Sequence, residues 1–301
     1  MVFRNTDLPT LFHHTDAVAI ARQREAVAAT RHQLLLLVLG AALGALSPSL
    51  RVGDFQPVGA LGVLAYAGVL ALGYRSSRRR AKSHWQLNRS AAEFIKSMCW
   101  RYAVHGAPFG SGASDADADA VFTARLEEGL RELAKVGWED PRTTDESAAA
   151  ADLITTPMRR LRAKAFSVRK ETYVRDRVIE QRNWYHRRTE ISRRATALWS
   201  ASIALLTLFA LFFATLRTFS VGDSLEATGV LSAAAAACLA WSEIRRHQPL
   251  IAAHSLVEED LAAMHTAMET TVTDAQWPSA VYETERIVSP QHTDWLVRHR
   301  S

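Results

Sequence analysis

Residues 195–216 read ATALWSASIALLTLFALFFATL, a run of 22 residues without a charged side chain. A helix that crosses the hydrocarbon core of a bilayer needs about 20 mostly apolar residues. This stretch therefore predicts a transmembrane helix. Three further stretches lack charged residues, namely 33–50, 55–74 and 227–242, and the last is short, rich in alanine and only mildly hydrophobic.

The four stretches form two pairs with short links. The sequence RVGD joins the first pair at 51–54, and RTFSVGDSLE joins the second at 217–226. Links of this length favour antiparallel helical hairpins, which we place at about 33–74 and 195–243. The rest of the chain lacks the alternating pattern of strands. The sequence therefore predicts an all-α membrane protein, with cytoplasmic helices at about 83–104, 119–136, 158–194, 250–272 and 280–298.

Basic residues set the expected orientation of the hairpins. Fifteen Lys and Arg residues flank the outer ends of the four stretches, whereas the links hold only Arg51 and Arg217. Cytoplasmic flanks of membrane helices carry an excess of Lys and Arg. Both termini are therefore expected in the cytoplasm.

The positive net charge of the chain also reflects the basic residues beside the apolar stretches. The 301 residues carry a formal net charge of +5, and the pI is about 9.5. Each dense basic run lies next to an apolar stretch, where Lys and Arg meet lipid headgroups. The lipid bilayer is thus the expected partner of these runs, and nucleic-acid binding by the helix at 158–194 is a secondary possibility.

Two patterns of acidic and histidine residues are of the kind that can bind metal ions. The run DADAD at 115–119 resembles the start of a calcium loop, but Ala120 and Leu126 stand where such a loop needs Gly and Glu. The second pattern is a stripe along one helix, formed by His254, Glu258, His265 and Glu269. We interpret it as a solvated face, since no other helix offers a matching Glu-x-x-His pair. No catalytic motif or dinucleotide fingerprint occurs, so we predict no enzyme, cofactor or metal.

The helix at 83–104 carries an unusual track of tryptophans and charges. Glu93 lies four residues after Arg89 and three before Lys96, so both can pair with it. Trp85 and Trp100 supply large surfaces on the same track. Two interpretations remain open: ordinary packing within the chain, or a surface that couples a cytoplasmic signal to the membrane.

A second motif lies within the first apolar stretch. Gly40 and Gly44 form a GxxxG pair, which lets membrane helices approach closely. The pair could serve packing within the hairpin or contact between subunits.

The hairpin, the basic flank and the Trp–Arg–Glu–Lys–Trp track together resemble the SLATT family, whose name stands for SMODS- and SLOG-associating two-transmembrane effector domains. The residues that carry the resemblance in the first half are Trp85, Arg89, Ala92, Glu93, Lys96, Trp100, Arg101, Tyr102, Pro108 and Phe109. In the second half they are Tyr173, Arg175, Arg177, Gln181, Trp184 and Tyr185, and a Glu-rich helix ending in Trp295 closes that half. We accordingly expect two SLATT-type units, at 1–145 and 146–301.

The resemblance implies a function. SLATT proteins are associated with prokaryotic conflict systems, where they are thought to form pores in the inner membrane beside nucleotide-signalling proteins. We therefore expect a multi-pass inner-membrane effector that forms homo-oligomers and responds to a cytoplasmic partner. The residues expected to couple or pack are Trp85, Arg89, Glu93, Lys96, Trp100, Arg101, Tyr173, Gln181, Trp184 and Tyr185. The alternatives are a membrane-anchored scaffold that recruits a partner without opening a pore, and an enzyme that uses the His/Glu stripe.

Overall fold

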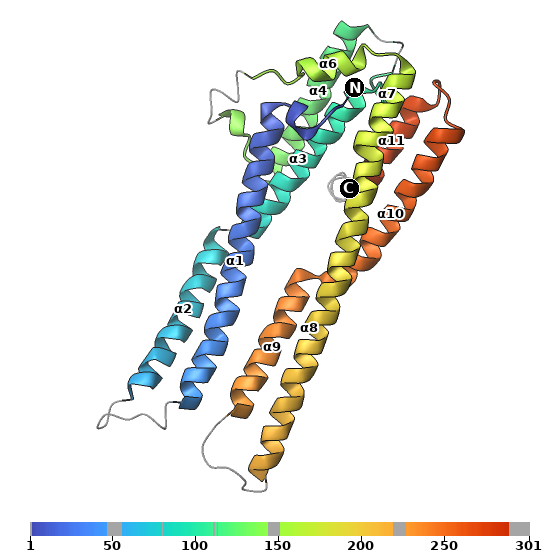
Figure 1. Cartoon of the computed structure of the whole chain (residues 1–301). Helices are drawn as coiled ribbons and strands as arrows, with labels where there is room; N and C mark the ends of the chain where they lie inside the picture. The colour runs from blue at the N-terminus through green and yellow to red at the C-terminus, as the bar shows by residue number, and fades with distance from the viewer. Residues whose placement is uncertain are drawn as a thin grey trace. The chain divides into compact units, whose positions relative to one another are not determined.

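The computed structural model describes residues 2–46, 56–79, 81–110, 112, 114–143, 151–218 and 227–288 (Figure 1). These residues form helices and connecting turns, and they contain no strand. The principal helices are α1 (Thr10–Leu46), α2 (Pro57–Arg79), α3 (Ala81–Ala103), α4 (Asp115–Lys135), α6 (Thr156–Arg162), α7 (Phe166–Tyr173), α8 (Glu180–Thr218), α9 (Ala227–Arg245), α10 (His247–Thr270) and α11 (Trp277–Val288). A π-helical turn at Val174–Ile179, called the π segment below, joins α7 to α8.

The chain divides into two compact units, and each draws on both halves of the sequence. The first, which we call the helical body, comprises the described residues within Met1–Gln23, Lys82–Arg187 and Ala253–Ser301. The second, which we call the hairpin unit, comprises those within Arg24–Ala81 and Arg188–Ala252.

The hairpin unit contains the apolar parts of α1, α2, α8 and α9. All four belong to helices long and apolar enough to cross a membrane. Almost none of their apolar residues is buried by other parts of the chain; Leu70 and Leu198, for example, are 75% and 64% exposed. The prediction of an all-α membrane protein with two apolar hairpins is confirmed. The link at 51–54 and most of the second link lie outside the described residues.

The predicted single helix at 158–194 is wrong in detail. The chain leaves helical geometry after α6 and resumes it at Phe166. The carbonyl of Arg162, at the end of α6, is instead bonded by the side chain of Arg169. Periodicity alone could not reveal this break, because the residues at 163–165 are compatible with a helix.

The last helix also differs from the prediction. It begins at Trp277 and not at about 280, so the stretch DAQWPSA at 274–280 includes the start of a helix. Pro278 lies in the first turn, where the missing N–H of proline is not needed by the helix. Residues 289–298 of the predicted helix lie outside the described residues.

The helical body has one hydrophobic core. Helix α4 contributes Phe122, Leu126, Leu130 and Leu133, which recur every three or four residues and therefore share one side of the helix. Helix α3 approaches α4 closely at Gly129, where an added Cβ would lie 2.2 Å from Cζ of Phe94. Ser114 begins α4, and its Oγ accepts a hydrogen bond from the Asp117 N–H at 3.2 Å.

Candidate functional site

A row of aromatic side chains crosses the core of the helical body. Trp100 of α3 packs edge-on against Phe3 and Tyr173, with ring centroids 4.8 and 5.6 Å away. Tyr173 in turn packs against Trp277 of α11 at 5.7 Å. Trp277 Nε1 donates to the carbonyl of Val104 at 2.7 Å. Residues from both halves of the sequence thus build one core, and Trp100, which is 2% exposed, lies inside it.

A buried ion pair lies beside this row. Arg177, in the π segment, binds Glu285 of α11 through two hydrogen bonds, Nε to Oε1 at 2.9 Å and Nη2 to Oε2 at 2.8 Å. The side chains are 1% and 2% exposed. The Tyr173 hydroxyl also donates to Glu285 Oε1, at 3.0 Å. Burial and the Glu285 carboxylate raise the pKa of Tyr173, so its hydroxyl keeps the proton that it donates. Burial opposes the charge of Arg177, but Glu285 outweighs it and raises the Arg177 pKa.

Lys96 and Arg101 of α3 lie near this pair. Lys96 is buried, and its pKa falls to about 8 because burial and the charge of Arg177 outweigh the nearby carboxylates, which include Glu93 and Glu285. Arg101 donates from Nε to the carbonyl of Ala107 at 2.7 Å. Its guanidinium also lies over the ring of Tyr282, 4.7 Å from the centroid. Of the predicted residues, Tyr173 thus bonds Glu285 directly, and the charge of Glu285 acts on Lys96 and Arg101.

The predicted pair of Arg89 and Glu93 is present as an ion pair along α3. Arg89 also reaches Asp16 of α1, with Nη1 3.2 Å from Oδ1. The sequence alone did not single out Asp16. Trp85, one turn before Arg89, is half-buried. This end of the track is more exposed than the end at Lys96 and Trp100.

The start of α8 packs against α10. Tyr185 donates from its hydroxyl to the carbonyl of Val288 at 3.0 Å, and its ring lies 5.3 Å from that of His254. Trp184 packs against the same histidine at 5.8 Å. Gln181, one turn earlier, is half-buried.

The His/Glu stripe of α10 has protein partners. Glu258 Oε1 lies 2.9 Å from His186 Nδ1, and His265 Nδ1 lies 3.5 Å from Arg182 Nη1. Within the described part of the chain, no three His, Cys, Asp or Glu side chains gather as a metal site would require. The stripe therefore joins α10 to α8.

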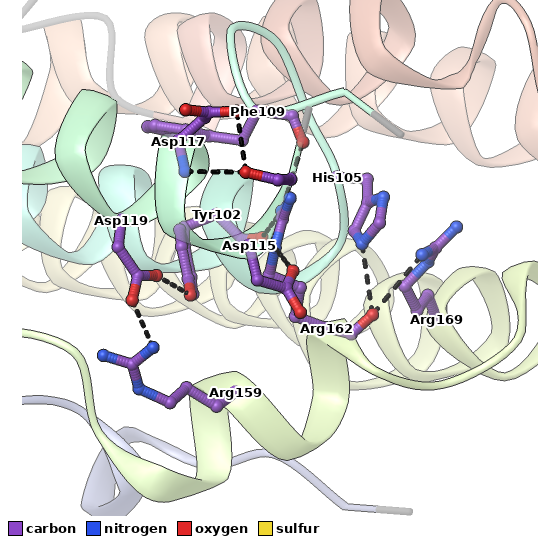
Figure 2. Close-up of polar contacts among 10 residues, drawn as sticks. Tyr102, His105, Phe109, Asp115, Asp117, Asp119, Arg159, Arg162 and Arg169 are labelled. Carbon is purple, nitrogen blue, oxygen red and sulfur yellow. Dashed lines mark hydrogen bonds and ion pairs between the residues drawn. The ribbon is translucent and has the colours of Figure 1, made fainter. Parts of the chain in front are cut away.

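The three aspartates of the DADAD run also take separate partners, as Figure 2 shows. The partners are Arg162 for Asp115, Ser114 for Asp117, and both Tyr102 and Arg159 for Asp119. The carboxylates lie in the first turns of α4, where the positive end of the helix favours negative charge. They anchor the start of this helix and do not surround a common point.

Arg162 closes the end of α3 (Figure 2). Its Nη1 donates to the carbonyls of Tyr102 and Phe109 at 3.0 and 3.1 Å. Its own carbonyl is bonded by Arg169 and lies 3.1 Å from His105 Nε2. Burial and the two arginines lower the pKa of His105 to about 4, so its ring is neutral at pH 7. Arg162 and Arg169 thus bond backbone carbonyls near helix ends, which is a structural role.

The glycine pair of the hairpin unit separates into two environments. A Cβ added to Gly40 would lie 2.8 Å from Cζ of Tyr66 on α2, so this glycine makes room for packing within the hairpin. A Cβ added to Gly44 would meet no described atom within 4 Å.

Sequence reasoning did not select Glu285 or give Arg177 a role. Arg177 belongs to the motif quoted for the second half, but no feature of the sequence distinguishes it from the other basic residues there. Glu285 has a distinguishing feature, because it lies on the stripe of buried α11 residues that includes Trp277, Val281 and Val288. A carboxylate among apolar residues of an amphipathic helix implies a buried cation opposite it.

The fold and this site define an all-α membrane protein with two apolar hairpins and a helical body whose core draws on both halves of the sequence. Residues 9–170 match the family described as SMODS and SLOG-associating 2TM effector domain 3, and residues 173–295 match SMODS and SLOG-associating 2TM effector domain 1. The chain therefore belongs to the SLATT family, with two such domains in tandem, as predicted. SLATT domains are two-transmembrane effector domains of conflict and defence systems. No curated protein and no solved structure matches the chain. The predicted boundary at 145/146 lies outside the described residues and stays a prediction.

Proposed function

We propose that this protein is an inner-membrane effector of a prokaryotic defence system, which oligomerises and permeabilises the membrane when a cytoplasmic trigger arrives. Both hairpins cross the membrane, and both termini lie in the cytoplasm. The observation that carries the proposal is the apolar surface of the hairpin unit, which the described chain leaves almost wholly uncovered. Such a surface is stable only against lipid or against further protein.

Assembly follows from the size of each hairpin. One hairpin cannot enclose a channel, and the described part of one copy supplies only four apolar helices, so we propose that several copies contribute helices to the pore. Gly44 supports such assembly, because no described side chain covers it and a small residue lets a neighbouring helix approach. The excess of basic residues on the outer flanks supports the orientation.

A nucleotide-signalling protein is the proposed source of the trigger. The family description names association with SMODS and SLOG proteins, which supports a partner of this kind. The helical body would receive the signal, because it holds most of the charged and aromatic residues of both family motifs.

Inducible expression in bacterial cells tests this function. We expect growth arrest together with uptake of a membrane-impermeant dye. Leu205→Asp is the negative control, since a charge in the middle of the 195–216 span costs insertion about 2.5–3.5 kcal/mol and should remove toxicity at equal synthesis. Normal growth without dye uptake, at full membrane content of the unaltered chain, would favour the scaffold alternative.

A further inference from the structure

The helix that leads into the third apolar stretch changes geometry at one place. Helix α7 ends at Tyr173, the π segment covers Val174–Ile179, and α8 then continues without interruption to Thr218. A π-helix bonds residue i to i+5, is rare, and occurs mostly as single turns at functional sites. The π segment of this chain belongs to the helical body and precedes, on the same continuous helix, the apolar span of α8.

Helix α11 holds this helix before, within and after the π segment. Tyr173, directly before it, donates to Glu285 at 3.0 Å. Arg177, inside it, binds the same carboxylate through two hydrogen bonds. Tyr185, after it, donates to the carbonyl of Val288 at 3.0 Å. We call these contacts of Glu285 and Val288 the α11 clasp.

The contacts of the α11 clasp cannot all be kept if the π segment adopts ordinary α-helical geometry. A turn closed by i→i+5 bonds holds one residue more than a turn closed by i→i+4 bonds. One residue corresponds to about 100° of rotation in an α-helix. If the π segment became α-helical while α7 stayed in place, α8 would rotate by about this angle, and Tyr185 would leave Val288.

One polar group remains unsatisfied while the α11 clasp is formed. Arg177 Nη1 is buried and has no hydrogen-bond acceptor among the described residues. An unsatisfied buried donor lowers the stability of the state that contains it. This unsatisfied donor offsets part of the stability that the two hydrogen bonds between Arg177 and Glu285 supply.

We propose that the α11 clasp is an autoinhibitory contact: its release lets the π segment relax to α-helix and rotates α8, including its apolar span, by about 100°. This inference rests on the proposed function, because it names the step that would link the helical body to the membrane. The rotation would present a different side of α8 to its neighbours in the bilayer and so permit assembly.

The first test compares Glu285→Gln with Glu283→Gln in the full-length protein. Glu283 lies on the same helix, is exposed and pairs with Arg286. Glu285→Gln should speed hydrogen exchange of the amides at 174–179 by at least tenfold and lower the expression level needed for dye uptake. Glu283→Gln should behave as the unaltered chain. Equal exchange in both variants would overturn the proposal.

The second test deletes Arg175, an exposed residue of the π segment. Without one residue the segment can become α-helical while Tyr173 and Tyr185 keep their positions. The deletion should therefore slow exchange at the remaining amides and abolish dye uptake at normal membrane content. A deletion variant that permeabilises cells as the unaltered chain does would contradict the proposal. The deletion of Arg175 still tests the proposal if Glu285→Gln fails to accumulate in the membrane.

The exchange measurement separates the two claims. If no chain causes dye uptake, yet exchange rises in Glu285→Gln and falls in the deletion, the clasp stands and the proposed function fails. If the unaltered chain causes dye uptake but neither variant changes exchange, the function stands and the clasp fails.

Discussion

Arg177 and Glu285 are 108 positions apart in the sequence and form a buried ion pair with two hydrogen bonds. Removing one partner of such a pair leaves a buried charge without compensation, at a cost of about 3–5 kcal/mol. We expect Arg177→Met to lower the free energy of unfolding by about this amount, as measured by denaturant titration of the solubilised protein. The double variant Arg177→Met/Glu285→Met should recover most of the loss. Additive losses in the double variant would show that the two side chains do not depend on each other.

Lys96 predicts a dependence of stability on pH. Its pKa in the folded protein is about 8, below the ordinary value of 10.5 that we assign to the unfolded chain. Above pH 8 the folded protein releases this proton while the unfolded chain keeps it, so the free energy of unfolding rises with pH. Between pH 8 and 9.5 the gain from Lys96 should be about 1–2 kcal/mol. Below pH 8 both states are protonated, and the contribution is constant.

The comparison with Lys96→Met isolates this effect. The difference in free energy of unfolding between the two proteins, measured by denaturant titration at several pH values, should change across pH 8–9.5 as Lys96 titrates. A difference independent of pH would mean that Lys96 titrates in the folded protein as it does in the unfolded chain.

Gly40 and Gly44 should respond differently to the same substitution. Gly40→Ile would place a side chain against the Tyr66 ring and should destabilise the first hairpin, and Tyr66→Ala should relieve the effect. Gly44→Ile should leave the hairpin intact but reduce the size of the oligomer in native mass measurements. An unchanged oligomer in Gly44→Ile would show that this side of α1 takes no part in assembly.

Cysteine labelling tests the orientation. In a background without Cys99 and Cys238, Ser49→Cys and Ser224→Cys should react with an impermeant maleimide added to intact cells. Ser76→Cys, near the end of α2 that we propose to lie in the cytoplasm, should react only after lysis. Labelling of Ser76→Cys from outside would reverse the topology.

Much of the fold could be predicted because membrane helices carry a strong local signal. The run at 195–216 and its three companions need only length and the absence of charge to be recognised. The pairing of Arg89 with Glu93 was also predictable, since residues four apart in a helix are neighbours.

The centre of the helical body was not predictable from one sequence. The partner of Arg177 lies 108 residues later, and no spacing rule connects the two. The π segment has no known composition signal, and it changes which side chains face α11. Trp100 was recognised as unusual, but only the structure shows that it packs between Phe3 and Tyr173.

Release of dye from vesicles that contain the purified protein tests the central claim most directly. Because assembly depends on concentration, raising the ratio of protein to lipid should favour the oligomer without any trigger. We predict that the initial release rate rises more steeply than in proportion to protein, and that large dyes are retained while small dyes escape. Intact vesicles at every ratio, with the protein shown to span the bilayer, would contradict the claim that this SLATT protein permeabilises membranes.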